Sequence, residues 1–384
     1  MADAYIFGAV RTAIGKRGGA LAATRPDELA GKNLRGLVEK AGIDAGEVED
    51  VIMGCVTQVG EQGMNIGRTA ALVAGFPITT TGTTVNRMCG SSLQTVNFAA
   101  QAVMSGMHDL VIGSGVESMS RVEMGADVAP LSPLLTDRFD IIPQGLSAEL
   151  IAEKWGLSRK DIDALAVESH RRAIAAQDEG WYQGEIGAVE VTTPAGETVS
   201  FEVDEGPRRD SSAEKVGKLR PAFKSDGVIT AAASSQISDG AASVLIGSKQ
   251  KGEALGLKPR ARFVATAVAG VDPTIMLTGP IPVTRKVLQK AGLSLREIEV
   301  FEVNEAFAPV VLAWAHELSE DPQELLARTN VFGGAMALGH PLGASGARLL
   351  TTLLNAMERR DARYGLATLC IGFGQAVATI IERV

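Results

Sequence analysis

The sequence is poor in cysteine, histidine and aromatic residues, and each scarcity excludes a class of protein. Its 384 residues include three cysteines, an odd number that is too small for a disulfide framework. We therefore expect free thiols in a reducing compartment. The three cysteines and four histidines lack the paired spacing of metal ligands, so the sequence predicts no metal site. Aromatic residues make up 4% of the chain while glycine occurs 43 times, a balance that favours α/β folds with tight turns.

Long basic runs and long apolar runs are absent as well. The net charge is −8 and the basic residues form no long run, which argues against binding to nucleic acid. No stretch approaches the length of a membrane span, and residues 1–6 lack the basic and apolar segments of an export signal. Residues 381–384 do not match a peroxisomal address. We expect a soluble, cytoplasmic protein without a membrane span.

Short apolar runs that end in glycine indicate buried strands. They occupy residues 50–54, 110–113 and 244–247. Residues 91–105 contain no charged side chain and carry apolar residues at helical spacing, which predicts a helix buried between layers. Because 46% of the chain is hydrophobic, it can bury at least one large core.

A weak internal repeat and one inserted segment define the predicted organisation. Residues 47–54 resemble residues 297–304, a passage from helix to strand in both places, which indicates two related α/β halves. Between residue 119 and about residue 236 the composition and the charge pattern of the chain change. There we expect a solvated helix over 158–179 and a hairpin over 189–203 with Ala195 and Gly196 at its turn. This lobe should cover one face of the core.

Cys89 lies where a strand-like segment, residues 84–88, gives way to the uncharged helix. Unpaired N–H groups and the helix dipole stabilise a thiolate, so we expect a thiol pKa below its ordinary value. Gly90 removes a side chain beside the sulfur, which we expect to leave room for an acyl group. Taken alone, Cys89 is better explained as a small buried apolar residue, and two further segments reverse that preference.

His340 stands before Pro341 in a glycine-rich loop, residues 330–346. Proline fixes its own backbone and restricts the residue before it, so the imidazole is held on a stiff turn. Histidine suits the removal of a thiol proton near neutral pH. The other histidines, at positions 108, 170 and 316, are interpreted as ordinary surface groups.

Cys370 ends a buried strand and is followed by Gly372 and Gly374. A thiol in this position is able to shuttle a proton. The two glycines lack the third glycine and the βαβ context of a dinucleotide fingerprint, so nicotinamide binding is rejected. Cys55 is expected to be a core residue.

These three segments, with residues 11–16, 115–120, 169–173 and 304–308, resemble the thiolase family over nearly the whole chain. The likeness is strongest to degradative 3-ketoacyl-CoA thiolases, also named acetyl-CoA C-acyltransferases. It implies an α/β thiolase fold with two similar βαβαβ-type halves in five α-β-α-β-α layers and an inserted loop domain. We expect the N-terminal half at 1–118 plus about 237–259, the CoA-binding lobe at 119–236 and the C-terminal half at 260–384.

The resemblance also implies roles for single residues. Cys89 matches the nucleophile that carries the acyl group, His340 its base, and Cys370 the second acid/base. Asn304 matches the residue that holds a water beside His340 in one oxyanion hole, and the N–H groups of Cys89 and Gly372 match the other hole. The expected contacts of coenzyme A are Arg208, Phe223, Ser235 and Phe307.

Two departures from the family pattern bear on the substrate. Residues 233–240 keep Ser235 but lose two asparagines of the usual motif, so the pantetheine contacts are expected to differ. Short-chain biosynthetic members carry His-Met-Gly where this chain has Pro143, Gln144 and Gly145, which indicates a remodelled acyl pocket. Residues 55–58 and 234–240 resemble the corresponding segments of some steroid-degrading relatives. We therefore expect cleavage of medium, long or bulky 3-ketoacyl chains.

Two other functions remain open at this point. The same residues serve biosynthetic formation of acetoacetyl-CoA, and a non-catalytic acyl-CoA or lipid carrier belongs to a different class. A carrier has no need of two cysteines and a histidine together. The resemblance further implies that coenzyme A is a substrate with no permanently bound cofactor. It implies a homodimer or homotetramer, and an association with other β-oxidation enzymes is a further expectation.

Overall fold

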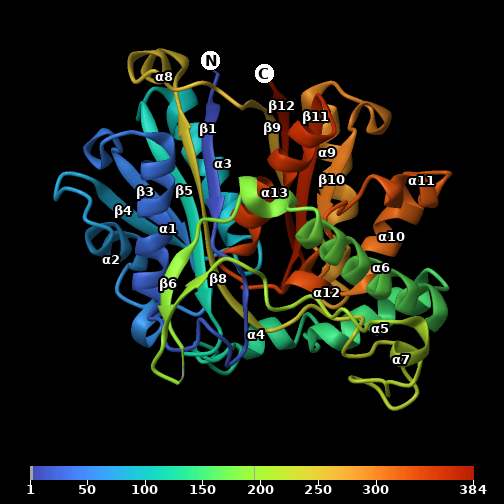
Figure 1. The fold of residues 1–384 in the computed structure, drawn as a ribbon. Helices are drawn as coiled ribbons and strands as arrows, with labels where there is room; N and C mark the ends of the chain where they lie inside the picture. The colour runs from blue at the N-terminus through green and yellow to red at the C-terminus, as the bar shows by residue number, and fades with distance from the viewer. Residues whose placement is uncertain (1–2, 194) are drawn as a thin grey trace.

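A ten-stranded mixed sheet runs through the computed structural model, which describes residues 3–193 and 195–384. The strand order is β10-β11-β12-β9-β1-β8-β5-β3-β4, and the short β2 pairs with β8 (Figure 1). The strands are β1 (Tyr5–Arg11), β2 (Gly15–Lys16), β3 (Asp50–Gly54), β4 (Thr81–Val85), β5 (Leu110–Ser118), β8 (Ser238–Gly247), β9 (Ala261–Gly270), β10 (Val300–Val303), β11 (Tyr364–Ile371) and β12 (Gln375–Arg383).

The two sequence halves meet at a short contact between β1 and β9. Only Tyr5 with Arg262 and Ile6 with Ala261 are paired there, in antiparallel register. Strands β4, β3, β5, β8 and β1 lie on one side of this contact, and β9, β12, β11 and β10 lie on the other. The predicted halves are therefore joined into one continuous sheet, a connection that the sequence did not predict.

Helices divide the molecule into the five predicted layers. The central layer is α3 (Ser91–Ser105) packed on α13 (Ser345–Arg359), and each helix contacts strands of both halves. Outside the first half lie α1 (Pro26–Ala41) and α2 (Ile66–Val73); outside the second lies α9 (Pro280–Ala291), which packs on α10 (Ala308–Leu318) (Figure 1). The expected buried helix at 91–105 is confirmed residue for residue as α3.

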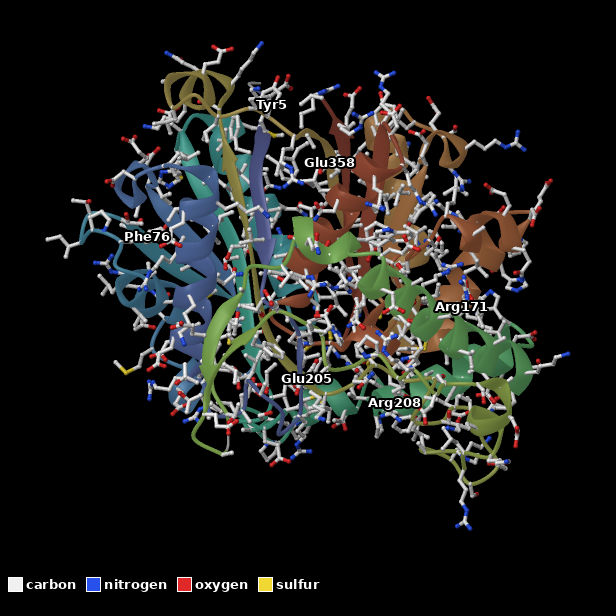
Figure 2. The ribbon with its side chains drawn as sticks, viewed as in Figure 1. Tyr5, Phe76, Arg171, Glu205, Arg208 and Glu358 are labelled. Atoms are coloured by element: carbon white, nitrogen blue, oxygen red, sulfur yellow. The ribbon has the colours of Figure 1, made fainter. Side chains whose placement is uncertain are left out.

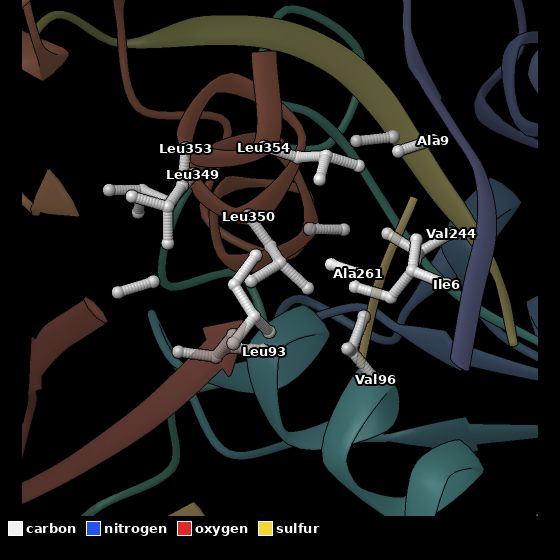
Figure 3. Packing of buried hydrophobic residues seen from close by; sticks show 14 of the residues in the cluster. Ile6, Ala9, Leu93, Val96, Val244, Ala261, Leu349, Leu350, Leu353 and Leu354 are labelled. Atoms are coloured by element: carbon white, nitrogen blue, oxygen red, sulfur yellow. The ribbon is translucent and has the colours of Figure 1, made fainter. Parts of the chain in front are cut away.

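The core between α3 and α13 is built from aliphatic side chains. Leu93 and Val96 of α3 belong to the same buried cluster as Leu350 of α13 and Val244 of β8 (Figure 3). Each of these side chains is at most 1% exposed. Full burial of such a side chain contributes about 1.5–3 kcal/mol, so this layer fixes how the two halves sit on each other.

The internal repeat is visible in how the outer helices end. Gly42 ends α1 with φ 70° and Gly292 ends α9 with φ 66°, a left-handed conformation that glycine adopts without steric cost. A single 3-10 turn follows in each half, η1 (Ala45–Glu47) before β3 and η5 (Leu295–Glu297) before β10. The two passages from helix to strand are therefore structurally equivalent.

Between β5 and β8 the chain leaves the large sheet. It forms α4 (Pro133–Thr136), α5 (Gln144–Lys154), α6 (Arg159–Asp178), η3 (Trp181–Gly184), β6 (Val189–Thr192), β7 (Thr198–Phe201) and α7 (Ala213–Gly217). The expected charged helix is α6, which begins with a capping box of Ser158 and Asp161. Strands β6 and β7 confirm the hairpin; its turn includes Gly196, at φ 85°, whereas Pro194 lies outside the described residues. The domain limits stay a prediction.

The remaining elements are short. They are η2 (Gly60–Gln62), α8 (Lys249–Ala254), η4 (Met276–Thr278), α11 (Pro322–Ala327) and α12 (Ala335–Leu338). Within the described part of the chain, every helix is too short or too polar to cross a membrane.

Candidate active site

Cys89 lies on a sharp turn that leads from β4 into α3. Met88, the residue before it, has φ 45°, an uncommon conformation for a residue with a side chain. The turn is closed by the N–H of Gly90, which donates to the carbonyl of Arg87 at 3.0 Å. Cys89 is 6% exposed, so it is a buried residue.

The charge state of Cys89 differs from the prediction. Burial raises the pKa of its thiol to about 11, although the N–H groups of Gly372 and of Cys89 itself lower it. The expected depressed pKa is therefore wrong, because desolvation outweighs the helix start and the two donors. The resting sulfur is a protonated thiol at neutral pH.

Gly90 serves packing rather than access. A Cβ atom at this position would lie 2.4 Å from Cδ1 of Ile371 and 3.0 Å from Cγ1 of Val377. The space beside Gly90 is thus filled by side chains of β11 and β12. The prediction that Gly90 leaves room for an acyl group is wrong, since the missing side chain lets α3 approach these strands.

Cys370 lies opposite Cys89 at the end of β11. It is 1% exposed, and burial raises the pKa of its thiol, with a further contribution from the proximity of Cys89. The N–H of Gly372, two residues further on, points to the Cys89 sulfur. The turn from β11 into β12 continues through Phe373, with φ 59°, and Gly374, with φ 76°. This turn brings one thiol and one N–H donor close to Cys89.

His340 is held in a defined orientation by the start of α13. Its Nδ1 lies 2.5 Å from the hydroxyl of Ser345, and that hydroxyl donates its own hydrogen to the carbonyl of Pro341 at 2.8 Å. Nδ1 must therefore carry the proton, which leaves the lone pair on Nε2. Burial and the positive charge of Arg348 lower the pKa of His340 to about 3. The imidazole is neutral at neutral pH, with an unprotonated Nε2.

Asn304 follows β10 and contacts the basic side of His340. Its Nδ2 lies 3.3 Å from His340 Nε2. Its Oδ1 is buried and has no hydrogen-bond partner among the described residues. A buried amide oxygen of this kind is suited to a water or a substrate group.

The starts of α3 and α13 bring the two sequence-distant segments together. The N–H of Ala347 donates to the hydroxyl of Ser92 at 2.9 Å. A Cβ on Gly346 would lie 2.1 Å from the backbone nitrogen of Leu93, so only glycine allows this approach. Cys89 and His340 each precede one of these helices, which places both at the same junction.

Glu117, which the sequence argument left without a role, connects two loops of this junction. Its buried carboxylate accepts the N–H groups of Val56 at 2.9 Å, Thr57 at 3.1 Å and Gly343 at 2.8 Å. Gly343 belongs to the loop that carries His340. Glu117 is thus a structural tie between the residue 55–57 segment and the histidine loop.

Glu305 makes the equivalent connection on the other side. It accepts hydrogen bonds from the hydroxyl of Ser169 at 2.6 Å, Nδ2 of Asn330 at 3.0 Å and the N–H of Met336 at 3.1 Å. Burial raises the pKa of this carboxyl, and the three donors lower it. The segment that holds Asn304 is thereby fixed to the glycine-rich loop.

Gln236 also positions the histidine loop and was not predicted to do so. Its Nε2 lies within 2.9–3.1 Å of the carbonyl oxygens of Gly206, Met336 and Ala337. Its own carbonyl accepts the N–H of His340 at 3.0 Å. In the sequence, the departure from the family motif at residues 233–240 was the one feature that pointed to Gln236.

Three of the four residues predicted to contact coenzyme A, namely Phe223, Ser235 and Phe307, lie close together, and Arg208 lies apart from them in the lobe. Arg208 lines a hollow of about 140 Å³ and is labelled in Figure 2. Ser235 donates its N–H to the carbonyl of Ala306 at 2.9 Å, which places it beside Phe307. Phe223 is 40% exposed and stacks edge-on against Phe307, with ring centroids 5.7 Å apart. Phe307 itself is 8% exposed and supports Phe223 from below.

His170 corrects one interpretation from the sequence. It is 4% exposed, and its Nδ1 accepts the N–H of Arg208 at 3.0 Å. Burial and the nearby charge of Arg208 lower the pKa of His170 to about 4. The prediction of a surface group is wrong here, because the charged neighbours occupy the other face of α6. His316 is exposed as expected.

Comparisons with known proteins agree with this arrangement. The family model "Thiolase, N-terminal domain" matches residues 4–250, and "Thiolase, C-terminal domain" matches residues 257–383. A steroid 3-ketoacyl-CoA thiolase of Mycobacterium tuberculosis is 47% identical over 100% of this chain and 95% of its own length. A 3-ketoacyl-CoA thiolase of Psychrobacter arcticus is 47% identical over 100% and 98%. The crystal structure of the Bacillus anthracis acetyl-CoA acetyltransferase superposes with a TM-score of 0.92 at 37% identity, covering 100% of this chain and 99% of that one. The chain belongs to the thiolase family of acyltransferases.

Proposed function

We propose that the protein is a 3-ketoacyl-CoA thiolase that uses coenzyme A to cleave 3-ketoacyl-CoA into acetyl-CoA and a shortened acyl-CoA. One observation carries the proposal: two buried thiols, Cys89 and Cys370, face each other beside the N–H of Gly372. A nucleophile and a separate carbon acid or base are what a C–C cleavage next to a thioester requires.

The first half-reaction forms the acyl enzyme. His340 Nε2 takes the proton of Cys89 while the sulfur attacks the C3 carbonyl of the substrate. The C2–C3 bond breaks, the acyl group stays on Cys89 as a thioester, and the C2 carbanion takes the proton of Cys370 to give acetyl-CoA. The proton on His340 then returns to the Cys370 thiolate, which restores both groups.

The second half-reaction transfers the acyl group. The thiol of coenzyme A gives its proton to His340, and its sulfur attacks the thioester carbonyl on Cys89. The Cys89 sulfur leaves and takes the proton back from His340. Because the resting thiol and imidazole are both neutral, each proton moves together with the attack, and the resting site holds no ion pair between them.

Negative charge on oxygen develops twice in this cycle. The N–H groups of Cys89 and Gly372 are placed to stabilise one oxyanion, and protonated His340 with Asn304 is placed for the other. Each such donor is typically worth about 3 kcal/mol in the transition state. The neutral Nε2 of His340 becomes a hydrogen-bond donor only after it has taken a proton. It therefore stabilises the oxyanion at the stage of the reaction when the negative charge develops.

We infer a preference for longer or bulky acyl chains. A Cβ on Gly372 would lie 2.9 Å from Sδ of Met88 and 3.1 Å from Nε2 of Gln144, so Gln144 reaches the catalytic centre from the start of α5. Support comes from the 47% identity to a relative named as a steroid 3-ketoacyl-CoA thiolase. Biosynthetic use of acetoacetyl-CoA is the competing function.

A panel of 3-ketoacyl-CoA substrates tests the function. We expect CoA-dependent thiolysis, with longer or branched chains turned over faster than acetoacetyl-CoA. Intact-protein mass measurement should show an acyl adduct that disappears in Cys89→Ser. An unchanged turnover in Cys89→Ser contradicts the mechanism, and a preference for acetoacetyl-CoA supports the biosynthetic alternative.

We also propose that the protein is a cytoplasmic homodimer or homotetramer. Strand β4 ends the sheet, and no strand of the described chain pairs with its outer edge. Such an edge is a template for pairing with a second copy. Sedimentation analysis tests the proposal, and a monomer at micromolar concentration contradicts it.

A further inference from the structure

A hollow of about 240 Å³ lies on the surface between α6, η3 and the C-terminal end of α13. Its lining includes Arg171, Arg172 and Arg360, with Trp181 and Val331, and Arg171 is labelled on α6 in Figure 2. None of the residues assigned above to catalysis or to coenzyme A lines this hollow.

Positive charge dominates the lining. Glu168 is the only carboxylate among the lining residues, and it already pairs with Arg171 at 2.6 Å and with Arg172 at 2.7 Å. Arg360 forms no ion pair with any described residue. Three guanidinium groups therefore face one carboxylate, on a protein whose net charge is −8.

The surrounding structure holds Arg172 and Arg360 close to each other. Nη1 of Arg172 donates to the carbonyls of Leu326 at 3.2 Å and Thr329 at 2.5 Å, which fixes its position. The pKa of Arg360 lies below its ordinary value because of burial and because of the charge of Arg172. An anion between the two guanidinium groups would relieve this repulsion.

Trp181 forms one wall of the hollow. Its Nε1 is buried and has no hydrogen-bond partner among the described residues. The indole is fixed between the ring of Phe332, with centroids 5.1 Å apart, and the guanidinium of Arg359, 4.7 Å from the ring centre. This N–H is enclosed by protein atoms, so Trp181 lines the hollow as a fixed aromatic wall rather than as a donor.

We propose that this hollow is a binding site for a small phosphate-class anion. Guanidinium groups present a planar fork of N–H donors and are the usual partners of phosphate oxygens. At about 30 Å³ for each water, the volume holds about eight waters, so inorganic phosphate and pyrophosphate both fit. The occupant would contact Val331, the neighbour of Asn330 in the loop that precedes His340.

Isothermal titration of the full-length protein with pyrophosphate, at constant ionic strength, tests the site. We expect saturable binding of one anion per chain, weakened about tenfold or more in Arg360→Ala because a charge-assisted hydrogen bond is lost. Arg285→Ala removes one positive charge from α9, outside the hollow, and should bind as the parent does.

Three results would overturn the proposal. The first is the absence of saturable binding to the parent protein. The second is an equal affinity in the parent and Arg360→Ala. The third is binding that saturating coenzyme A abolishes, since the anion would then occupy the coenzyme A site. Circular dichroism of each variant, together with its thiolysis rate, shows that the fold is retained.

Discussion

The hydroxyl of Ser345 lies 2.5 Å from Nδ1 of His340 and gives its own hydrogen to the carbonyl of Pro341. One hydroxyl thereby decides which imidazole nitrogen carries the proton. Because Ser345 begins α13, the basic nitrogen is aimed by the same helix start that packs against α3. Orientation of the base is thus a direct result of how the two halves are joined.

Removal of this hydroxyl should lower turnover without unfolding the protein. We expect kcat of Ser345→Ala to fall about tenfold to a hundredfold, because a hydrogen bond to a group that becomes charged contributes about 1.5–3 kcal/mol. The measurement is steady-state thiolysis together with thermal unfolding.

Thr351→Val is the matched control for this change. Thr351 lies in the same helix, is fully buried and donates to the carbonyl of Ala347 at 2.8 Å, the same kind of bond that Ser345 makes to Pro341. Its removal should leave kcat within about twofold of the parent, because it touches no reacting group. Equal kcat in the parent and Ser345→Ala would show that the hydroxyl does not set the tautomer.

The raised pKa of Cys89 predicts how its reactivity depends on pH. Only the thiolate is alkylated, so a thiol with a pKa of about 11 should react with iodoacetamide about tenfold faster for each pH unit up to pH 10. A free cysteine, with a pKa of about 8.5, would approach a plateau over the same range. Mass measurement of the Cys89 adduct between pH 7 and pH 10 follows this rate. A plateau below pH 9 would contradict the raised pKa.

Much of the fold was predictable because it depends on local composition. The uncharged stretch at 91–105 could only be a buried helix, and the charged stretch at 158–179 appears as α6 with solvated and buried faces. The pairing of β1 with β9 was not predictable, because two residue pairs between distant strands leave no periodic signal. For the same reason the union of both halves into one sheet appeared only in three dimensions.

The site was predictable to the level of motifs but not to the level of charge states. The sequence pointed to Cys89, His340 and Cys370, yet the pKa of Cys89 moved opposite to the prediction, since burial depends on the whole fold. Gln236 and Glu117 were missed because most of their partners are backbone groups distant in sequence: Met336 lies 100 positions from Gln236, and Thr57 lies 60 positions from Glu117. Such contacts have no sequence signature of their own.

Cys370 should be required for one half-reaction and dispensable for the other. In the proposed cycle it protonates the carbanion of acetyl-CoA but takes no part in acyl transfer between Cys89 and coenzyme A. We expect Cys370→Ala to lower thiolysis by about a thousandfold, within the usual range for a general acid. Exchange of labelled coenzyme A with a saturated acyl-CoA should stay within about tenfold of the parent rate.

The control for this split is the third cysteine. Cys55 is buried, and we expect Cys55→Ala to retain both thiolysis and exchange, with a small loss of stability from the lost sulfur. Loss of thiolysis and exchange to the same degree in Cys370→Ala would indicate that the thiol supports the site as a whole. The separate roles of the two active-site cysteines would then be refuted.

Close approach of the β5 backbone to the histidine loop should make Gly115 sensitive to substitution. A Cβ there would lie 2.1 Å from the carbonyl oxygen of Gly343 and 2.4 Å from Cβ of Ser92, so Gly115→Ala must push the loop away. We expect a loss of about 1–3 kcal/mol in unfolding free energy, as overpacking of a core typically costs, and a lower kcat. Gly36→Ala is the matched control, because no atom lies within 4 Å of its added Cβ in α1. It should raise stability by about 0.5–1 kcal/mol through helix propensity and leave kcat unchanged. Denaturant unfolding and thiolysis of both variants measure these effects, and equal stability of the two would mean that the histidine loop yields freely at Gly343.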